Sequence, residues 1–151
     1  MAGESVRAVL NQVWSALQPR EYQCALMGGI ALAAWNHPRA TRDVDFLIGV
    51  DSAQLESVVD RLCEIGCRPK REPLLVEVGE LHFAQFLVTP PGEFYDVQFD
   101  LMLAESDFQK SALTRRVRRD VPGVDSPIDV LNCDDLILFK LLAGRMIDRA
   151  D

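Results

Sequence analysis

The stretch Asp43–Ile48 alternates acidic and apolar residues, and this alternation restricts the fold more than any other part of the chain. Successive side chains of a strand point to opposite sides of a sheet, so Asp43 and Asp45 share one face and the apolar residues share the other. The apolar face requires a covering layer, whereas the acidic face requires water or a cation. The pattern therefore predicts a strand with one buried face and one wet, acidic face, in a sheet on which helices pack.

Apolar periodicity divides the rest of the chain into helices and strands. Helical spacing predicts helices at Val6–Leu17, Ile30–Trp35, Leu55–Ile65, Glu105–Arg119 and Cys133–Ala143, and apolar or alternating runs predict strands at Tyr22–Met27, Leu74–Val78, Leu81–Val88 and Phe94–Leu103. This order predicts an α/β (α+β) fold in which helices flank one mixed β-sheet. With 151 residues, 48% of them hydrophobic, the chain can bury one core, so we expect a single domain over residues 1–151.

The charge and hydropathy patterns exclude several classes of protein. A net charge of −7 argues against non-specific coating of nucleic acid, which depends on basic side chains that release counterions from phosphates. The longest stretch without charged or strongly polar side chains, Ala25–Trp35, is shorter than the roughly 18 residues that cross a bilayer. The N-terminus lacks a basic start followed by an apolar run, so we expect a cytoplasmic protein with no membrane partner.

Two short motifs carry candidate chemistry, and each also has a purely structural interpretation. Gly28-Gly29 follows a predicted strand and opens a predicted helix, where glycines and free backbone N–H groups favour phosphate, although a tight turn would need the same glycines. Asp43 and Asp45 repel each other unless a cation such as Mg²⁺ lies between them, although a solvated sheet edge would also tolerate the pair.

Asp100 is a third candidate because it lies among apolar residues, between Phe99 and Leu101. A carboxylate in such a strand is costly to bury without compensation, and a metal ion shared with Asp43 and Asp45 would supply it. Asp96 has the same strand parity and is the rival candidate. The alternative for both residues is a strand with one solvated side.

Together, these motifs resemble the signature of the DNA polymerase β-like nucleotidyltransferase superfamily, in its branch of minimal nucleotidyltransferases and AbiEii-type toxins. The resemblance rests on Met27-Gly28-Gly29 followed by Asp43-Val44-Asp45-Phe46, on Arg39 and Thr41 between them, on Phe99-Asp100-Leu101-Met102, and on a C-terminal stretch from Asp135 through Lys140 to Gly144-Arg145 and Asp148. Separated motifs thus occur in the family's order over most of residues 25–151.

The resemblance implies a nucleotidyltransferase fold and the transfer of a nucleoside monophosphate from an NTP to an acceptor hydroxyl. Asp43, Asp45 and Asp100 would be catalytic and would hold two Mg²⁺ ions, for which Mn²⁺ can substitute. Asp100 would also help to orient or deprotonate the acceptor. The nucleotide would be bound by Gly28, Gly29, Arg39, Thr41 and Lys140.

Lys140 is the only charged residue between Leu136 and Ala143, and a helix that is apolar nearly all round is predicted to be buried. Such a lysine either extends its amine to water or meets an anion, and the motif favours a triphosphate contact. The basic run of Lys110, Arg115, Arg116, Arg118 and Arg119 is interpreted as a solvated helix face, with guidance of an RNA acceptor or an acidic partner as the alternative.

Three functional hypotheses remain open. The first is an active, Mg²⁺-dependent nucleotidyltransferase whose acceptor is tRNA, another RNA, a protein or a small molecule. The second is a catalytically inactive nucleotide- or partner-binding module on the same fold, favoured by the glycine at position 29, where many relatives have serine. The third adds a role as the toxin of a toxin–antitoxin pair, with an antitoxin protein as partner. Relatives usually continue beyond this length, so the C-terminus at Asp151 is interpreted as either truncated or unusually short.

Overall fold

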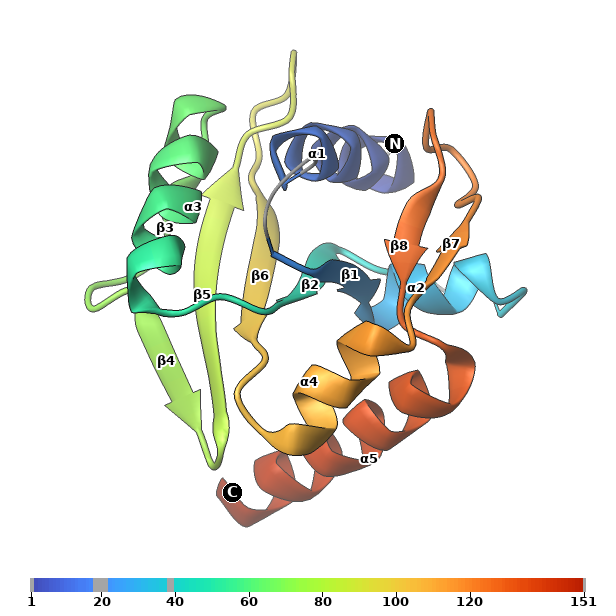
Figure 1. Cartoon of the computed structure of the whole chain (residues 1–151). Coiled ribbons are helices and arrows are strands. Elements are labelled where there is room, and N and C mark those ends of the chain that lie inside the picture. Colours follow the sequence, from blue (N-terminus) through green and yellow to red (C-terminus); the bar gives the residue numbers. More distant parts are fainter. Residues whose placement is uncertain (1, 18–21, 38–39, 151) are drawn as a thin grey trace.

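The computed structural model of the chain describes residues 2–17, 22–37 and 40–150. Its elements are α1 (Ala2–Leu17), β1 (Cys24–Met27), α2 (Gly28–Ala34), β2 (Asp43–Ile48), α3 (Ser52–Glu64), β3 (Arg68–Pro69), β4 (Leu75–Val78), β5 (Leu81–Val88), β6 (Val97–Leu103), α4 (Asp107–Thr114), β7 (Val117–Arg119), β8 (Ile128–Val130) and α5 (Cys133–Ala150), as Figure 1 shows. Within the described ranges, no helix is long and apolar enough to cross a bilayer.

The described strands form one mixed sheet in the order β3-β5-β6-β2-β1-β8-β7, with β4 also paired to β5. The acidic strand β2 lies in its centre, parallel to β6 and antiparallel to β1. Helix α1 packs against β2, β6 and α3, whereas α2 packs against β1, β2 and α5 (Figure 1). The predicted α/β (α+β) class, with helices flanking one mixed sheet, is confirmed.

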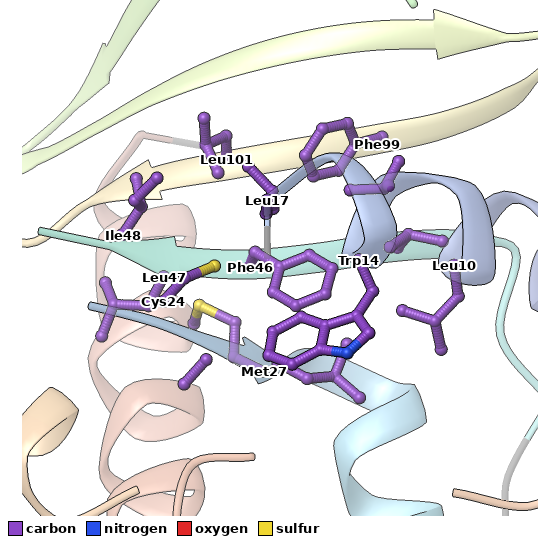
Figure 2. Close-up of a cluster of buried hydrophobic side chains, with 14 of the residues drawn as sticks. Leu10, Trp14, Leu17, Cys24, Met27, Phe46, Leu47, Ile48, Phe99 and Leu101 are labelled. Atoms are coloured by element: carbon purple, nitrogen blue, oxygen red, sulfur yellow. The ribbon is translucent and has the colours of Figure 1, made fainter. Parts of the chain in front are cut away.

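The apolar face of β2 lies against α1, in the core. Phe46 is fully buried, and its ring stacks on Trp14 of α1 with centroids 5.9 Å apart and meets Phe99 of β6 edge-on at 6.2 Å. Figure 2 shows this cluster, with Leu10 and Leu17 of α1 near the aromatic rings. Because α1 covers this face, the acidic side chains of β2 must leave from the opposite one.

The predicted helix over Glu105–Arg119 is wrong in its second half. Helix α4 begins with a capping box between Ser106 and Gln109 and ends at Thr114, and Val117–Arg119 then forms strand β7 beside β8. Strands of two or three residues, such as β3, β7 and β8, are too short to show a period in the sequence. Their pairing with distant strands decides their structure.

Lys110 is exposed on α4, but the arginines of the basic run lie beyond the end of this helix and do not form a helix face. Arg115 donates two hydrogen bonds, at 3.0 and 2.9 Å, to the buried carboxylate of Asp135 at the start of α5. Arg118 and Arg116 both pair with Asp129 of β8, and Arg119 donates to the Ala34 carbonyl. These arginines tie the end of α4 to α5, and strand β7 to β8 and α2.

Replacing Arg115 with alanine is expected to lower the free energy of unfolding more than removing an exposed ion pair does, because it leaves the Asp135 carboxylate buried without its two charge-assisted hydrogen bonds. Urea denaturation measures the change. The matched variant Arg118→Ala removes a surface pair whose arginine side chain is 59% exposed, and its expected cost is below about 1 kcal/mol. Equal losses in the two variants would show that burial of Asp135 does not set the cost.

Helix α5 also differs from expectation. It continues through position 144 to Ala150 rather than ending at Gly144, since a single helical glycine costs only about 1 kcal/mol. It is not buried all round either. Leu136 and Phe139 pack into the core, but Ile137 and Leu141 are 51% and 59% exposed. One face of α5 therefore packs on the domain, and the other stays open.

Candidate active site

The three predicted carboxylates lie on adjacent central strands. Asp43 and Asp45 belong to β2 and Asp100 belongs to β6, and the parallel register pairs Asp45 directly with Asp100 and Asp43 with Gln98. Paired residues project to the same face of a sheet, as do residues two apart on one strand. The structure therefore brings the three carboxylates together on the face opposite α1.

The Asp45 carboxylate is uncompensated within the described residues. Burial, followed by the charges of Asp100 and Asp43, raises its pKa from 3.8 to about 7, and no described cation or hydrogen-bond donor opposes them. A buried carboxylate without a partner is costly and favours either a proton or a bound cation. This position therefore attracts positive charge.

Asp100 is held by neighbours that the sequence patterns did not assign to a site. The Gln98 side-chain amide donates to its Oδ1 at 2.9 Å, and Lys70 Nζ donates to Gln98 Oε1 at 2.7 Å. Gln85 of β5 lies directly opposite Asp100 in the antiparallel register. Burial raises the pKa of Asp100, whereas the Gln98 hydrogen bond and the Lys70 charge act in the opposite direction. These contacts orient the carboxylate.

Strand parity could have indicated Gln98, but not Lys70. Lys70 reaches Gln98 because β3 pairs with β5, and a two-residue strand has no local signal. The rival Asp96 does not join the cluster. It precedes β6, pairs with Arg68 at 2.8 Å and accepts a hydrogen bond from Thr89.

The glycine turn lies against the acidic cluster. Gly28 has φ = +75°, and a Cβ at this position would lie 2.4 Å from Asp45 Oδ2, so both its backbone conformation and its neighbour require glycine. Gly29 packs against the Thr41 side chain, where an added Cβ would lie 3.1 Å from the Thr41 Cβ. The turn therefore brings the backbone of Gly28 against the Asp45 side chain.

Of the two residues predicted between the glycine turn and β2, the structure describes Thr41 but not Arg39. The Thr41 hydroxyl bonds the backbone of Asp43, donating to its carbonyl at 3.3 Å and accepting from its N–H at 3.4 Å, and so braces the start of β2. Arg39 lies outside the residues that the structure describes. The same is true of the side chains of Arg145 and Asp148.

A cavity of about 880 Å³ extends from the glycine turn to α5. Its lining includes Gly28, Gly29, Thr41, Asp45 and Lys140, together with Leu32, Asn36, His37 and Ile137. Ligand pockets commonly span about 300–1,000 Å³. Lys140 is exposed, not enclosed by apolar residues as predicted, and it reaches the cavity because only one face of α5 is packed. A long anionic ligand could thus meet Lys140 and the glycine turn together.

Comparison with known families finds one match, the family described as "Nucleotidyl transferase AbiEii toxin, Type IV TA system", over residues 12–150. Comparison with curated proteins finds no match.

Solved structures share the fold at low sequence identity. A candidate nucleotidyltransferase from Thermotoga maritima has 16% identity and a TM-score of 0.65, with 94% of this chain and 86% of that one covered. The antibiotic-resistance factor ANT(2″)-Ia has 15% identity and a TM-score of 0.60, with coverages of 100% and 77%. JHP933 from Helicobacter pylori has 12% identity and a TM-score of 0.52, with coverages of 88% and 53%.

Proposed function

Because this chain belongs to the AbiEii nucleotidyl transferase family and is therefore a nucleotidyltransferase, we propose that it moves a nucleoside monophosphate from an NTP to an acceptor hydroxyl with the help of Mg²⁺, acting as a single domain. One observation carries the proposal. Asp43, Asp45 and Asp100 converge on one sheet face beside the Gly28 turn, at the edge of a cavity large enough for a nucleotide.

The acidic cluster suits a divalent cation by its donor chemistry. Hard cations such as Mg²⁺ prefer carboxylate oxygens, and the raised pKa of Asp45 marks a position that lacks positive charge. Among the described residues, no three histidine, cysteine or acidic side chains already form a metal-binding group. Binding would therefore require Asp43, Asp45 and Asp100 to turn toward a common point. Bound there, the metal would polarise the α-phosphate and stabilise charge on the leaving group.

The chain's own groups supply binding and orientation. Gly28 and Gly29 line the cavity at the turn, where their backbone N–H groups would bind phosphate oxygens, with Lys140 adding a charge from α5. Gln98 and Lys70 hold the Asp100 carboxylate, which would orient the acceptor hydroxyl. Attack by the hydroxyl oxygen on the α-phosphorus forms the new phosphoester bond and breaks the bond to the pyrophosphate leaving group.

Transfer of label tests the proposal directly. The full chain is incubated with each α-labelled NTP, Mg²⁺ or Mn²⁺, and bulk tRNA or cell extract. We expect a labelled acceptor with the wild type and none with Asp43→Ala. Absence of transfer by the wild type, or equal transfer by Asp43→Ala, would refute it.

The toxin role is a further part of the proposal and rests on the family's description. Expression of the chain is expected to arrest growth, and Asp45→Ala is expected to relieve the arrest. Unaffected growth with the wild type at a verified protein level would contradict a toxin role but not the chemistry.

Replacing Lys140 with methionine is expected to weaken NTP binding about tenfold, since a lost ion contact worth about 1.4 kcal/mol has that effect. Titration calorimetry with nucleotide and Mg²⁺ measures the change. Lys110→Met is the control, because Lys110 is an exposed lysine of α4 that does not line the cavity. Similar affinity in the two variants would remove Lys140 from the nucleotide site.

A further inference from the structure

A second cavity, of about 250 Å³, lies against the acidic cluster. Its walls are Met27 of β1, Phe46 of β2, Val78 of β4, Leu81 and Phe83 of β5, and Met102 of β6, and it ends on Asp45 and Asp100. Met27, Asp45 and Met102 line both cavities, so the two cavities adjoin. A group held here would therefore lie next to a ligand in the larger cavity.

The lining of this smaller cavity restricts what it can hold. Its charged side chains are those of Asp45 and Asp100, and its other walls are apolar. The polar edge of a nucleobase would lose its hydrogen bonds to water without replacement. A compact apolar group fits the apolar walls, and a single hydroxyl on it that points toward Asp100 fits the acidic end of the cavity.

The wall residues favour a ring over an aliphatic chain. Phe83 offers an aromatic side chain, and Met27 and Met102 offer thioethers, whose sulfurs make favourable contacts with aromatic rings. The volume lies just below the range of about 300–1,000 Å³ that is typical of drug-sized ligands. One six-membered ring suits this space better than a nucleoside does.

We propose that this smaller cavity is the acceptor site and that the acceptor is a phenolic hydroxyl on an uncharged body, an inference that rests on the nucleotidyl transfer proposed above. In the step, the phenol oxygen bonds to the α-phosphorus, the bond to the β-phosphate oxygen breaks, pyrophosphate leaves, and the phenolic proton passes to water. The product is a phenyl phosphodiester. The phenol comes either from a free small molecule or from a tyrosine side chain.

The test presents matched acceptors to the full chain with α-labelled NTP and Mg²⁺. The acceptors are 4-methylphenol, a capped tyrosine tripeptide, the same peptide with phenylalanine, the same peptide with serine, and bulk tRNA. We expect label on one or both phenols, at least tenfold above the serine peptide, and none on the phenylalanine peptide. Preference between 4-methylphenol and the tyrosine peptide separates the two sources.

A wall variant connects the acceptor to this cavity. Val78→Trp fills the space from β4 and is expected to lower transfer to the phenol at least tenfold while nucleotide binding stays unchanged. Val76→Trp is the matched control, because Val76 is half-buried on the same strand and does not line the cavity. Phe83→Leu keeps an apolar side chain and is expected to raise KM for the phenol severalfold with little change in kcat.

Binding is also measured without turnover. The Met102 methyl NMR signal is expected to shift when 4-methylphenol is added to the wild type, and not when it is added to Val78→Trp, whose remaining spectrum reports its fold. Label on tRNA but on neither phenol would overturn the acceptor inference and leave the proposed function standing. Label on no acceptor at all would overturn both. Equal phenol transfer by wild type and Val78→Trp would remove the acceptor from this cavity.

Discussion

Replacing Asp45 with asparagine is expected to lower nucleotidyl transfer at least about a thousandfold and, at pH 8 without divalent cations, to make the folded protein more stable. The loss of activity follows because the charge that attracts the cation is gone while the shape is kept. The gain in stability follows because Asp45 is a partly buried carboxylate whose neighbours are Asp43 and Asp100. A residue that costs stability and supports activity is typical of a functional site.

The sign of the pH effect follows from the raised pKa. In the folded protein the pKa of Asp45 is about 7, against 3.8 for the ordinary side chain, so the folded state keeps a proton that the unfolded chain releases. Protonated, neutral Asp45 therefore contributes its full stabilisation of the folded state below about pH 4, and this contribution is lost as the pH rises through 7. At pH 8 the cost is on the order of 2 to 4 kcal/mol.

Urea denaturation of wild type and Asp45→Asn at pH 5 and pH 8 measures this cost, and the difference between the two proteins cancels the other titrating groups. Asp60→Asn, at an exposed position of α3, is the control and is expected to match the wild type. Adding Mg²⁺ at pH 8 should stabilise the wild type more than Asp45→Asn. If the difference in unfolding free energy between wild type and Asp45→Asn did not change with pH, the burial of charge at Asp45 would be contradicted.

Replacing Gly28 with alanine is expected to destabilise the fold by about 1–3 kcal/mol and to lower transfer more than about a hundredfold. The new Cβ is unfavourable for two reasons, the backbone conformation and a steric contact. The positive φ of 75° costs about 1 kcal/mol for any residue with a side chain, and the Cβ would stand 2.4 Å from Asp45 Oδ2. Relief of the contact must displace the carboxylate, and a shift of about 1 Å near the reacting atoms can cost a hundredfold in rate.

Gly92→Ala separates the two penalties. Gly92 has a φ of 77°, almost the same as Gly28, and nothing lies within 4 Å of an added Cβ. It is therefore expected to cost about 1 kcal/mol and to leave transfer unchanged. In an Asp45→Ala background, Gly28→Ala should lose most of its extra cost over Gly92→Ala, because the carboxylate contacts at 2.4 and 3.0 Å are gone and only the contact with the Cβ of residue 45, at 3.1 Å, remains. If Gly28→Ala kept its full cost in free energy in that background, the new Cβ would clash with a residue other than Asp45.

Patterns that depend on near neighbours in the chain were predicted correctly. The alternation over Asp43–Ile48 indicated strand β2, its acidic face and its buried face, and the helical spacing over Leu55–Ile65 indicated α3. The Gly28-Gly29 turn was also located. These features depend on side-chain alternation, helical periodicity and backbone freedom, which act within a few residues.

Patterns that depend on contacts between distant segments of the chain were predicted wrongly. The run around Arg115 resembled a helix face because nothing local reveals that Asp135 and Asp129 would pair with it. The apolar composition of α5 predicted burial, but how much of a helix is covered depends on the size of the layer that it packs on.

The sequence by itself determined which residues could do the chemistry: a pair of carboxylates on one strand face, a third on another strand, a glycine turn and a lysine, because strand parity and glycine's backbone freedom are local properties. Only the tertiary structure decided that these groups meet. The parallel register of β2 and β6 sets Asp45 beside Asp100, the turn after β1 brings Gly28 against Asp45, and the β4–β5 hairpin encloses the apolar cavity beyond. Register between strands far apart in the chain depends on the packing of the whole core, and no local pattern carries it.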